Sequence, residues 1–210
     1  MIDILIVDDH AVVRDGVKRL VDEQLGAAIF GEASTAQEAL QLVRQAHWDV
    51  VVLDIALGER NGLEVLKELQ QLHPKLPVLI LSMHAEDQYA RRAFKAGAAG
   101  YITKDSSRTE LGKAIDKVIT GGRYVSPTLA EKLAFDMVRG TDRPRHEALS
   151  NREFEVVRLI ALGKTVSEIA ELLSLSDKTI STYRARILEK MSMKTNAEIT
   201  HYAIKNRLVE

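Results

Sequence analysis

The stretch VVVLDIALGERNGLEVL, residues 50–66, decides the fold of the first part of the chain. It opens with four consecutive apolar residues, a run that is typical of a strand buried on both faces. Asp54 follows directly, and after a polar loop the apolar residues Leu63 and Leu66 return at helical spacing. A buried strand, a loop and a helix in this order form one unit of a parallel α/β sheet.

The same unit recurs through the first 120 residues. Five segments carry strand-like runs: 4–7, 29–33, 50–53, 78–81 and 100–103. Four segments that alternate with them show helical periodicity: 36–45, 62–72, 88–95 and 108–119. This alternation predicts an α/β domain with a doubly wound, five-stranded parallel sheet of the flavodoxin-like kind, covered by helices on both faces.

The second part of the chain has a different pattern. A Gly-Gly pair follows the last of these helices, as is usual just past a helix C-terminus. Residues 121–148 contain one more amphipathic stretch, 128–138, and then Gly, Pro and charges without an apolar period, so we predict a linker here. From Leu149 onward every segment has helical periodicity and there is no proline. We therefore predict a first domain over 1–120 and an all-α domain over 149–210.

Composition limits the classes of function. The chain has no cysteine, which excludes disulfides and thiolate metal sites. Residues 1–10 turn acidic after a few apolar residues, unlike a secretory signal, and no apolar run approaches the roughly 20 residues of a membrane span, so we expect a cytoplasmic protein. Residues 1–120 hold 14 Lys and Arg against 18 Asp and Glu, whereas 149–210 hold 10 against 8. The two domains are thus expected to have different partners, and the second permits nucleic-acid binding.

Polar residues stand at the ends of four predicted strands. Asp8 and Asp9 follow the first strand, Asp54 the third, Ser82 ends the fourth and Lys104 follows the fifth. Because the carboxyl ends of parallel strands meet at one edge of the sheet, these side chains are expected to converge. Clustered carboxylates suit a hard divalent cation such as Mg²⁺, and a lysine and a hydroxyl beside them suit a phosphoryl group.

These segments resemble the receiver domain of bacterial response regulators. The resemblance covers residues 1 to about 120 and rests on LIVDDH, VVLDIALGERNGLEVL, VLILSMH and AGAAGYITKD. It implies that Asp54 accepts a phosphoryl group from a sensor histidine kinase, and that Lys104 and Ser82 bind the phosphoryl oxygens. It also implies a set of Mg²⁺ ligands: Asp8, Asp9, Asp54 and the backbone carbonyl of Ala56.

Three neighbouring positions add detail to this resemblance. Tyr101 stands three residues before Lys104, where the family has the aromatic residue whose rotation accompanies the movement of Ser82. Gly58 departs from the family, which often has proline there, and we expect a loop with more backbone freedom. His84 is expected to border the path by which water reaches the acyl phosphate, with an inert exposed histidine as the alternative.

The second domain contains a helix–turn–helix pattern. Residues 166–173 and 177–191 predict two helices, separated by the short turn Ser174-Leu175-Ser176. Ser176 or Asp177 can cap the second helix. Geometry alone is equally compatible with a small helical bundle that has no nucleic-acid role.

A second resemblance concerns residues 149–208, which are similar to the DNA-binding domain of LuxR-type regulators. The matching parts are Arg152-Glu153, Ser167-Glu168-Ile169-Ala170, Lys178-Thr179-Ile180 and Asn196-Ala197-Glu198. Tyr183 departs from the family, which usually has histidine there. Joined to a receiver, such a domain resembles the NarL/FixJ subfamily, and this implies binding to double-stranded DNA.

Helical geometry divides the second helix of this pattern into two sides. At about 100° per residue, one stripe is predicted to be buried: Ile180, Ile187, Leu188 and Met191. The residues expected to meet DNA, at phosphates or base edges, are Lys178, Thr179, Ser181, Thr182, Ala185 and Arg186. Arg184 falls on the apolar side and is expected to contact a neighbouring helix.

The last predicted helix, 196–205, is expected to contribute to self-association. The resemblance implies a homodimer when the protein is phosphorylated or DNA-bound, and dimers of this kind read two half-sites. The contact residues predicted on this helix are Ile199, Tyr202 and Ala203.

Two other classes of function fit parts of the pattern. A Mg²⁺-dependent phosphotransferase or phosphatase can use a nucleophilic Asp, but the chain has no insertion that would form a substrate pocket. A protein-interaction switch can use phosphorylation without touching DNA. We predict a phosphorylation-dependent transcriptional regulator, not an enzyme, whose receiver takes part only in its own phosphorylation and dephosphorylation. Steep weakening of DNA binding by salt separates it from the interaction switch.

Overall fold

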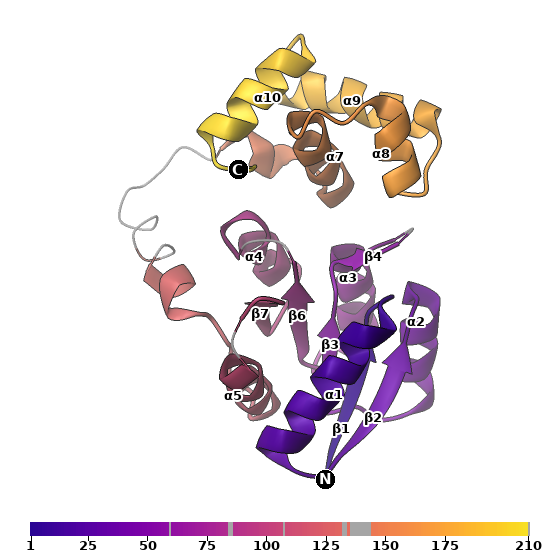
Figure 1. Ribbon diagram of the computed structural model, residues 1–210, viewed down its shortest axis with the longest axis vertical. Helices are drawn as coiled ribbons and strands as arrows, with labels where there is room; N and C mark the ends of the chain where they lie inside the picture. The colour runs from indigo at the N-terminus through magenta and orange to yellow at the C-terminus, as the bar shows by residue number, and fades with distance from the viewer. Residues whose placement is uncertain (59, 84–85, 107, 132–133, 135–143, 210) are drawn as a thin grey trace. The chain divides into compact units, whose positions relative to one another are not determined.

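The computed structural model describes residues 1–58, 60–83, 86–106, 108–131, 134 and 144–209. Chain contacts divide it into two compact units, Met1–Phe135 and Asp136–Glu210. Figure 1 labels most of the helices and strands of both units. Within the described ranges, no helix has the length and apolar character needed to cross a membrane.

The N-terminal unit is built on a five-stranded parallel sheet with the strand order β2-β1-β3-β6-β7. Its strands are β1 (Ile2–Val7), β2 (Ala28–Ala33), β3 (Val50–Leu53), β6 (Val78–Ser82) and β7 (Gly100–Thr103). The three strongest apolar runs of the sequence are the three central strands, and β3 and β6 are buried throughout. The predicted doubly wound sheet is therefore confirmed.

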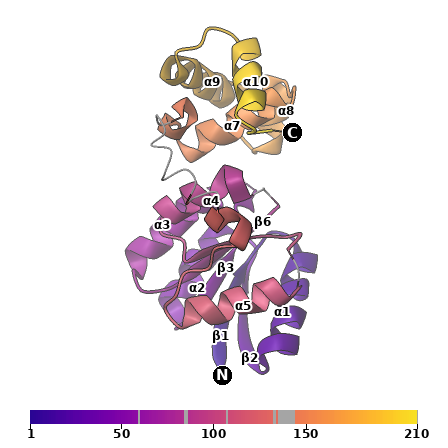
Figure 2. The same ribbon diagram turned by 90° about the vertical axis from the view of Figure 1, so that its left-hand side faces the viewer.

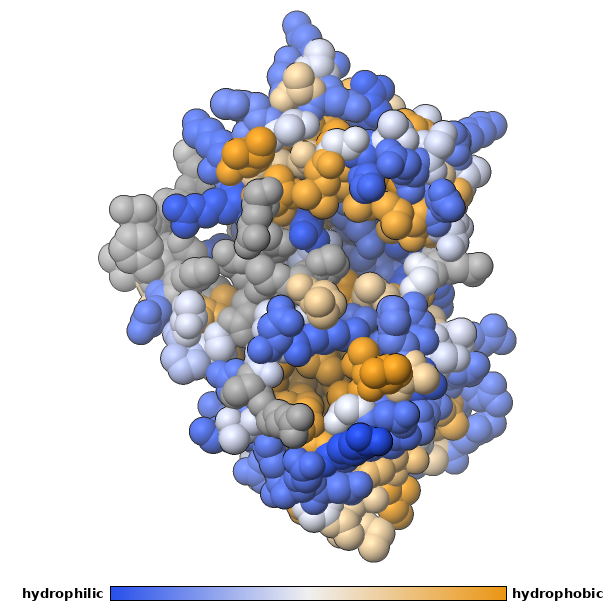
Figure 3. Space-filling model, in the orientation of Figure 1, coloured by the Kyte–Doolittle hydropathy of each residue, from blue (hydrophilic) through white to orange (hydrophobic). Residues whose placement is uncertain are grey.

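The helices that follow the strands are α1 (Ala11–Leu25), α2 (Ala36–Gln45), α3 (Gly62–Leu72), α4 (Glu86–Lys95) and α5 (Arg108–Ile119). Helices α1 and α5 pack together over one face, and Figure 2 shows α1 and α3 on opposite sides of the sheet. Helix α1 was not among the predicted segments, although Val13, Val17, Leu20 and Val21 recur at helical spacing and pack in or against the core. Apolar surface is visible in a hollow on the face that carries α1 (Figure 3).

The loop after Asp54 folds into a small hairpin. Strands β4 (Ala56–Leu57) and β5 (Arg60–Asn61) pair antiparallel, and Gly58 between them has φ +53°. Proline is fixed near φ −65° and cannot adopt this conformation, so glycine suits the turn at this position. A β-carbon at Gly62 would collide with the carbonyl oxygen of Asp54, so a second glycine lets the start of α3 approach this loop.

The described ends of the predicted linker each contact one of the two units. The amide of Tyr124 donates to the carbonyl of Ala99 beside β7 at 2.9 Å, and Leu129 is buried in the N-terminal unit. The 3₁₀ helix η1 (Arg145–Ala148) belongs to the C-terminal unit, where Nδ1 of His146 lies 3.0 Å from the hydroxyl of Tyr202. Most of the stretch 128–138, for which a helix was predicted, lies outside the described residues.

The described part of the C-terminal unit is entirely helical. After η1 come α7 (Asn151–Ala161), α8 (Val166–Leu172), α9 (Asp177–Met191) and α10 (Asn196–Lys205). A Ser or Thr side chain caps the N-terminus of each α-helix: Ser150, Thr165, Ser176 and Thr195. The helices enclose a small core that includes Phe154, Ile169, Ile180 and Ile187. The predicted helix–turn–helix over α8 and α9 is confirmed.

Candidate functional site

The carboxyl ends of three strands bring an ammonium group and two carboxylates together. Nζ of Lys104 lies 2.6 Å from Oδ2 of Asp8 and 2.7 Å from Oδ2 of Asp54. The sheet itself sets this geometry, because its backbone hydrogen bonds continue past the strand ends. The amide of Asp54 donates to the carbonyl of Val7, and the amide of Lys104 donates to the carbonyl of Ser82. These residues are distant in sequence, yet the register of the parallel strands fixes them side by side.

Burial gives this cluster its electrostatic character. Asp8 and Asp54 are 2% and 3% exposed, and the side chain of Lys104 is 11% exposed. Burial raises the pKa of Asp54, and its bond to Lys104 offsets only part of that effect. Burial alone would lower the pKa of Lys104, but the bonds to Asp54 and Asp8 outweigh it and raise the pKa. Lys104 is therefore a permanent cation beside two buried carboxyl groups.

A second set of groups extends the cluster toward solvent. Nδ1 of His10 lies 2.6 Å from Oδ1 of Asp9 and 3.3 Å from Oδ1 of Asp8, so the three residues offer ligand atoms within 4.8 Å of one another. The amide of Ala56 donates to Oδ1 of Asp54 at 3.2 Å, which places Ala56 at the same edge. This oxygen-rich donor set fits a hard divalent cation. His10 was not singled out in the sequence, although it directly follows the Asp pair.

Two further predicted residues, Ser82 and Tyr101, lie on the neighbouring strands β6 and β7. Ser82 is fully buried at the end of β6 and pairs in register with Thr103, next to Lys104. Tyr101 is fully buried in β7, opposite Ile80. Their part in switching stays a prediction, and His84 lies outside the described residues.

In the C-terminal unit, α9 separates an apolar side from an exposed side as predicted. Ile180, Ile187 and Met191 are buried, while Leu188 is half-buried. Five of the residues predicted to meet DNA are exposed: Lys178, Ser181, Thr182, Ala185 and Arg186. Thr179 is half-buried, and its amide donates to Oγ of the capping residue Ser176 at 3.1 Å.

Two polar interactions hold α9 against its neighbours. Nε of Arg184 donates to Oδ1 of Asn196 at the start of α10 at 2.6 Å, so Arg184 contacts a neighbouring helix as predicted. Nζ of Lys190 donates to both carboxylate oxygens of Glu153 in α7, at 2.9 and 2.7 Å. Burial alone would raise the pKa of Glu153, but the bonds from Lys190 and Ser150 outweigh it and lower the pKa. The sequence shows the capping box of Glu153 with Ser150 but not its pairing with Lys190.

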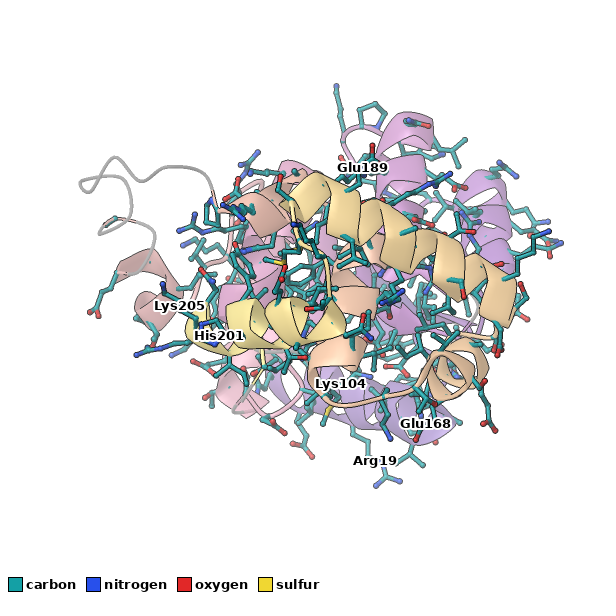
Figure 4. All side chains as sticks on the ribbon, turned by 90° about the horizontal axis from the view of Figure 1, so that it is seen from above. Arg19, Lys104, Glu168, Glu189, His201 and Lys205 are labelled. Carbon is teal, nitrogen blue, oxygen red and sulfur yellow. The ribbon has the colours of Figure 1, made fainter. Side chains whose placement is uncertain are left out.

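The residues predicted for the dimer contact need correction. Ile199 and Ala203 are fully buried where α10 packs on α7, so they supply no surface to a partner. Tyr202 is half-buried and bonds to His146. An apolar helical period predicts that one face of the helix is buried. It does not distinguish burial in the domain's own core from burial against a second chain. The exposed residues of α10 include His201, Ile204 and Lys205, of which Figure 4 labels the first and the last.

Both units match known protein families. The family of response regulator receiver domains matches residues 4–116, which hold the acidic cluster. The luxR family of bacterial regulatory proteins matches residues 147–203, which hold α7 to α9 and most of α10.

Similarity to individual proteins extends along the whole chain. The response regulator GacA of Pseudomonas protegens is 36% identical over 210 residues, which cover 100% of this chain and 99% of that protein. The response regulator UvrY of Escherichia coli K12 is 34% identical, with 99% and 96% covered. A crystal structure of a LuxR-family two-component response regulator from Aurantimonas is 39% identical with a TM-score of 0.61, and covers 65% of this chain and 97% of that one.

The receiver match spans more than half of the chain, and relatives above 30% identity span nearly all of it. The chain belongs to the NarL/FixJ response regulators, which join a receiver domain to a LuxR-type DNA-binding domain.

Proposed function

We propose that this response regulator accepts a phosphoryl group on Asp54 and that phosphorylation controls DNA binding by α9. The observation that carries the proposal is the pair of bonds from Nζ of Lys104 to Asp8 and Asp54, at 2.6 and 2.7 Å. They hold a permanent cation beside a buried carboxyl group, at the sheet edge where ligands bind in doubly wound folds. A nucleophilic carboxylate needs such a neighbour, because the incoming phosphoryl group brings further negative charge.

In the proposed reaction an oxygen of Asp54 attacks the phosphorus of a phosphohistidine on a sensor histidine kinase. The new O–P bond forms as the P–N bond breaks, and the leaving imidazole takes a proton from solvent. Lys104 then donates to the phosphoryl oxygens, and the hydroxyl of Ser82 donates a second hydrogen bond. Mg²⁺ when bound would neutralise part of the phosphoryl charge, held by these groups: Asp8, Asp9, Asp54 and the backbone carbonyl of Ala56.

The exposed side of α9 is proposed to enter the major groove of double-stranded DNA. Lys178 and Thr179 at the start of the helix would contact phosphates and set its position. The small exposed residues Ser181, Thr182 and Ala185 let the helix approach base edges closely, including thymine methyl groups. Arg186 adds a further cation on the same side.

Self-association is proposed on the exposed side of α10. Ile204 is 59% exposed, and His201 and Lys205 are exposed beside it (Figure 4). A single helix–turn–helix offers few contacts, so two copies reading half-sites about one helical turn apart gain affinity. Phosphorylation of Asp54 would shift the protein toward this homodimer, in the cytoplasm where the kinase domain and the DNA are accessible.

Two measurements test this function. Intact-mass spectrometry after incubation with acetyl phosphate and Mg²⁺ should show one added phosphoryl group on the wild type and none on Asp54→Asn. Undiminished phosphorylation of the variant would refute the assignment of the acceptor.

Fluorescence anisotropy with a duplex obtained by in vitro selection should show binding that weakens steeply between about 50 and 200 mM salt, as phosphate contacts release counterions. No duplex binding at low salt would favour the alternative, a switch that acts on other proteins alone. The family assignment sets aside a phosphotransferase acting on small molecules.

A further inference from the structure

Arg14, in the first turn of α1, bonds the backbone that carries the two acidic residues after β1. Its Nη1 donates to the backbone carbonyl of Asp8 at 2.8 Å, and its Nε donates to Oε2 of Glu32 in β2 at 2.8 Å. The arginine side chain is 15% exposed, so most of it is packed against the protein. Arg14 has no part in the proposed function.

The two bonds of Arg14 connect the loop after β1 to the neighbouring strand. A guanidinium group is planar and holds its donors in fixed directions, so it can bridge two acceptors with little freedom. Glu32 lies opposite Ile6 in the register of β1 and β2, and Nζ of Lys18 also bonds its carboxylate, at 2.6 Å. The far end of the bridge is therefore fixed by the sheet and by a second cation.

The bond to the carbonyl of Asp8 sets the direction in which Asp9 leaves the strand. The carbonyl of Asp8 and the amide of Asp9 belong to one planar peptide group, so fixing the first also orients the second. The carboxyl group of Asp8 is buried and held by Lys104, whereas Asp9 is exposed. Because Arg14 bonds the backbone, it places Asp9 beside Asp8 and leaves the carboxylate oxygens of both residues for other partners.

The positive charge of Arg14 is offset by its partner. A free guanidinium at this distance would repel a divalent cation held by the two carboxylates. The bonds from Lys18 and Arg14 lower the pKa of Glu32, so Glu32 is ionised at neutral pH and neutralises the arginine. The bridge can thus orient acidic residues while adding little repulsion.

We propose that Arg14 is a positioning residue for the divalent cation of the receiver, holding the peptide between Asp8 and Asp9 so that both carboxylates can bind one ion. The inference rests on the proposed function, which places the cation at these carboxylates. Removing a group that orients metal ligands from outside the coordination shell typically costs about 10- to 100-fold in affinity, and we expect about tenfold for Arg14→Gln.

The test measures Mn²⁺ binding to the full chain by the electron paramagnetic resonance signal of the free ion, since Mn²⁺ takes the same oxygen ligands as Mg²⁺. Arg14→Gln should bind Mn²⁺ about tenfold more weakly than the wild type. Arg14→Lys keeps the charge but cannot hold two donors in one plane, so it should lose most of the same affinity. Fluorescence of Trp48, the single tryptophan of the chain, verifies that the receiver is folded before metal is added.

Lys18→Gln is the matched control. It also removes a cation from Glu32, but among the contacts of the described residues Lys18 bonds Asp15 and Glu32 and not Asp8. This variant should keep the wild-type affinity for Mn²⁺. The sign of the change separates positioning from charge, because loss of a nearby cation alone would strengthen the binding of a divalent cation.

The rate of phosphorylation by acetyl phosphate gives a second readout. Saturating Mg²⁺ should restore the wild-type rate in Arg14→Gln, because Asp54 and Lys104 are held by the sheet and not by Arg14. A rate that stays low at saturating Mg²⁺ would overturn the proposal.

Three results of the Mn²⁺ titrations would also overturn it: unchanged or tighter binding in folded Arg14→Gln, full affinity in Arg14→Lys, or an equal loss in Lys18→Gln. Absence of Mn²⁺ binding to the wild type would instead refute the metal site of the proposed function, and the inference with it.

Discussion

Replacing Lys190, near the end of α9, by methionine removes the cation that pairs with the buried carboxylate of Glu153 in α7. Both oxygens of Glu153 accept from Nζ of Lys190, and the Glu153 side chain is 3% exposed while that of Lys190 is 41% exposed. The capping bond from the amide of Ser150 to Glu153 remains in the variant. The substitution therefore leaves a largely buried carboxylate with its local bonds but without its counter-charge.

The size of the effect follows from this asymmetry of exposure. Removing one partner of a buried ion pair costs about 3–5 kcal/mol, whereas an exposed pair contributes about 0–1 kcal/mol. With one partner buried and the other half in solvent, we expect a loss of about 1–3 kcal/mol, or about 5- to 150-fold in the equilibrium for opening the domain. Glu153→Gln keeps the capping geometry and removes the charge, so it should suppress most of the effect of a second substitution at Lys190.

Hydrogen exchange measured by mass spectrometry on the full chain follows this loss, because peptides from α7 and α9 report the DNA-binding domain alone. Lys164→Met serves as the matched control. Its partner Glu168 is 3.5 Å away and both side chains are about half exposed, so the expected loss is about 0.5 kcal/mol or less. Equal exchange in the Lys190 and Lys164 variants, or additive effects of the Glu153 and Lys190 substitutions, would refute the reasoning.

The same pair gives a pH dependence of known sign. The pKa of Glu153 is lowered in the folded protein, so its contribution to stability is present above the unfolded pKa of about 4.3. That contribution is lost as the pH falls through the lower, folded value. The stability difference between wild type and Glu153→Gln should therefore shrink below about pH 4 and be constant between pH 5 and 7.

Two further predictions concern α10 and α9. Ile199→Ala creates a cavity between α10 and α7 and should lower the stability of the domain by about 2–5 kcal/mol. Ile204→Ala, at a 59% exposed position, should change it by about 0.5 kcal/mol or less. Hydrogen exchange of the α10 peptide compares the two variants, and equal losses of stability would contradict the assignment of the buried face. Lys178→Ala should weaken duplex binding uniformly across sequences and reduce the salt slope by about 1, and an unchanged slope in anisotropy titrations would remove Lys178 from the phosphate contacts.

Much of the receiver could be predicted from the sequence because its signals are local and strong. Continuous apolar runs predicted β1, β3 and β6. Because parallel strands end at one edge of the sheet, the sequence also predicted that Lys104 lies close to Asp8 and Asp54. Helix α1 was missed although Val13, Val17, Leu20 and Val21 recur at helical spacing and pack in or against the core. Its N-terminus has no capping side chain to mark where the helix begins.

In the DNA-binding domain, contacts between helices could not be predicted from the sequence. The apolar face of α10 was visible, but the sequence does not say whether that face meets α7 or a second chain, and the structure places Ile199 and Ala203 in the domain's own core. The pair of Glu153 and Lys190 joins residues 37 apart on different helices, and no local pattern marks such a contact. The division of α9 into buried and exposed sides was predicted correctly because helical period alone decides it.

The coupling between Asp54 and DNA is tested most directly by the affinity of the full chain for one selected duplex, measured with and without acetyl phosphate and Mg²⁺ at fixed salt. We expect phosphorylation to tighten binding by about 5- to 150-fold in the wild type and to leave Asp54→Asn at its unphosphorylated affinity. Equal affinities for the phosphorylated and unphosphorylated wild type, or an equal gain in Asp54→Asn, would contradict it.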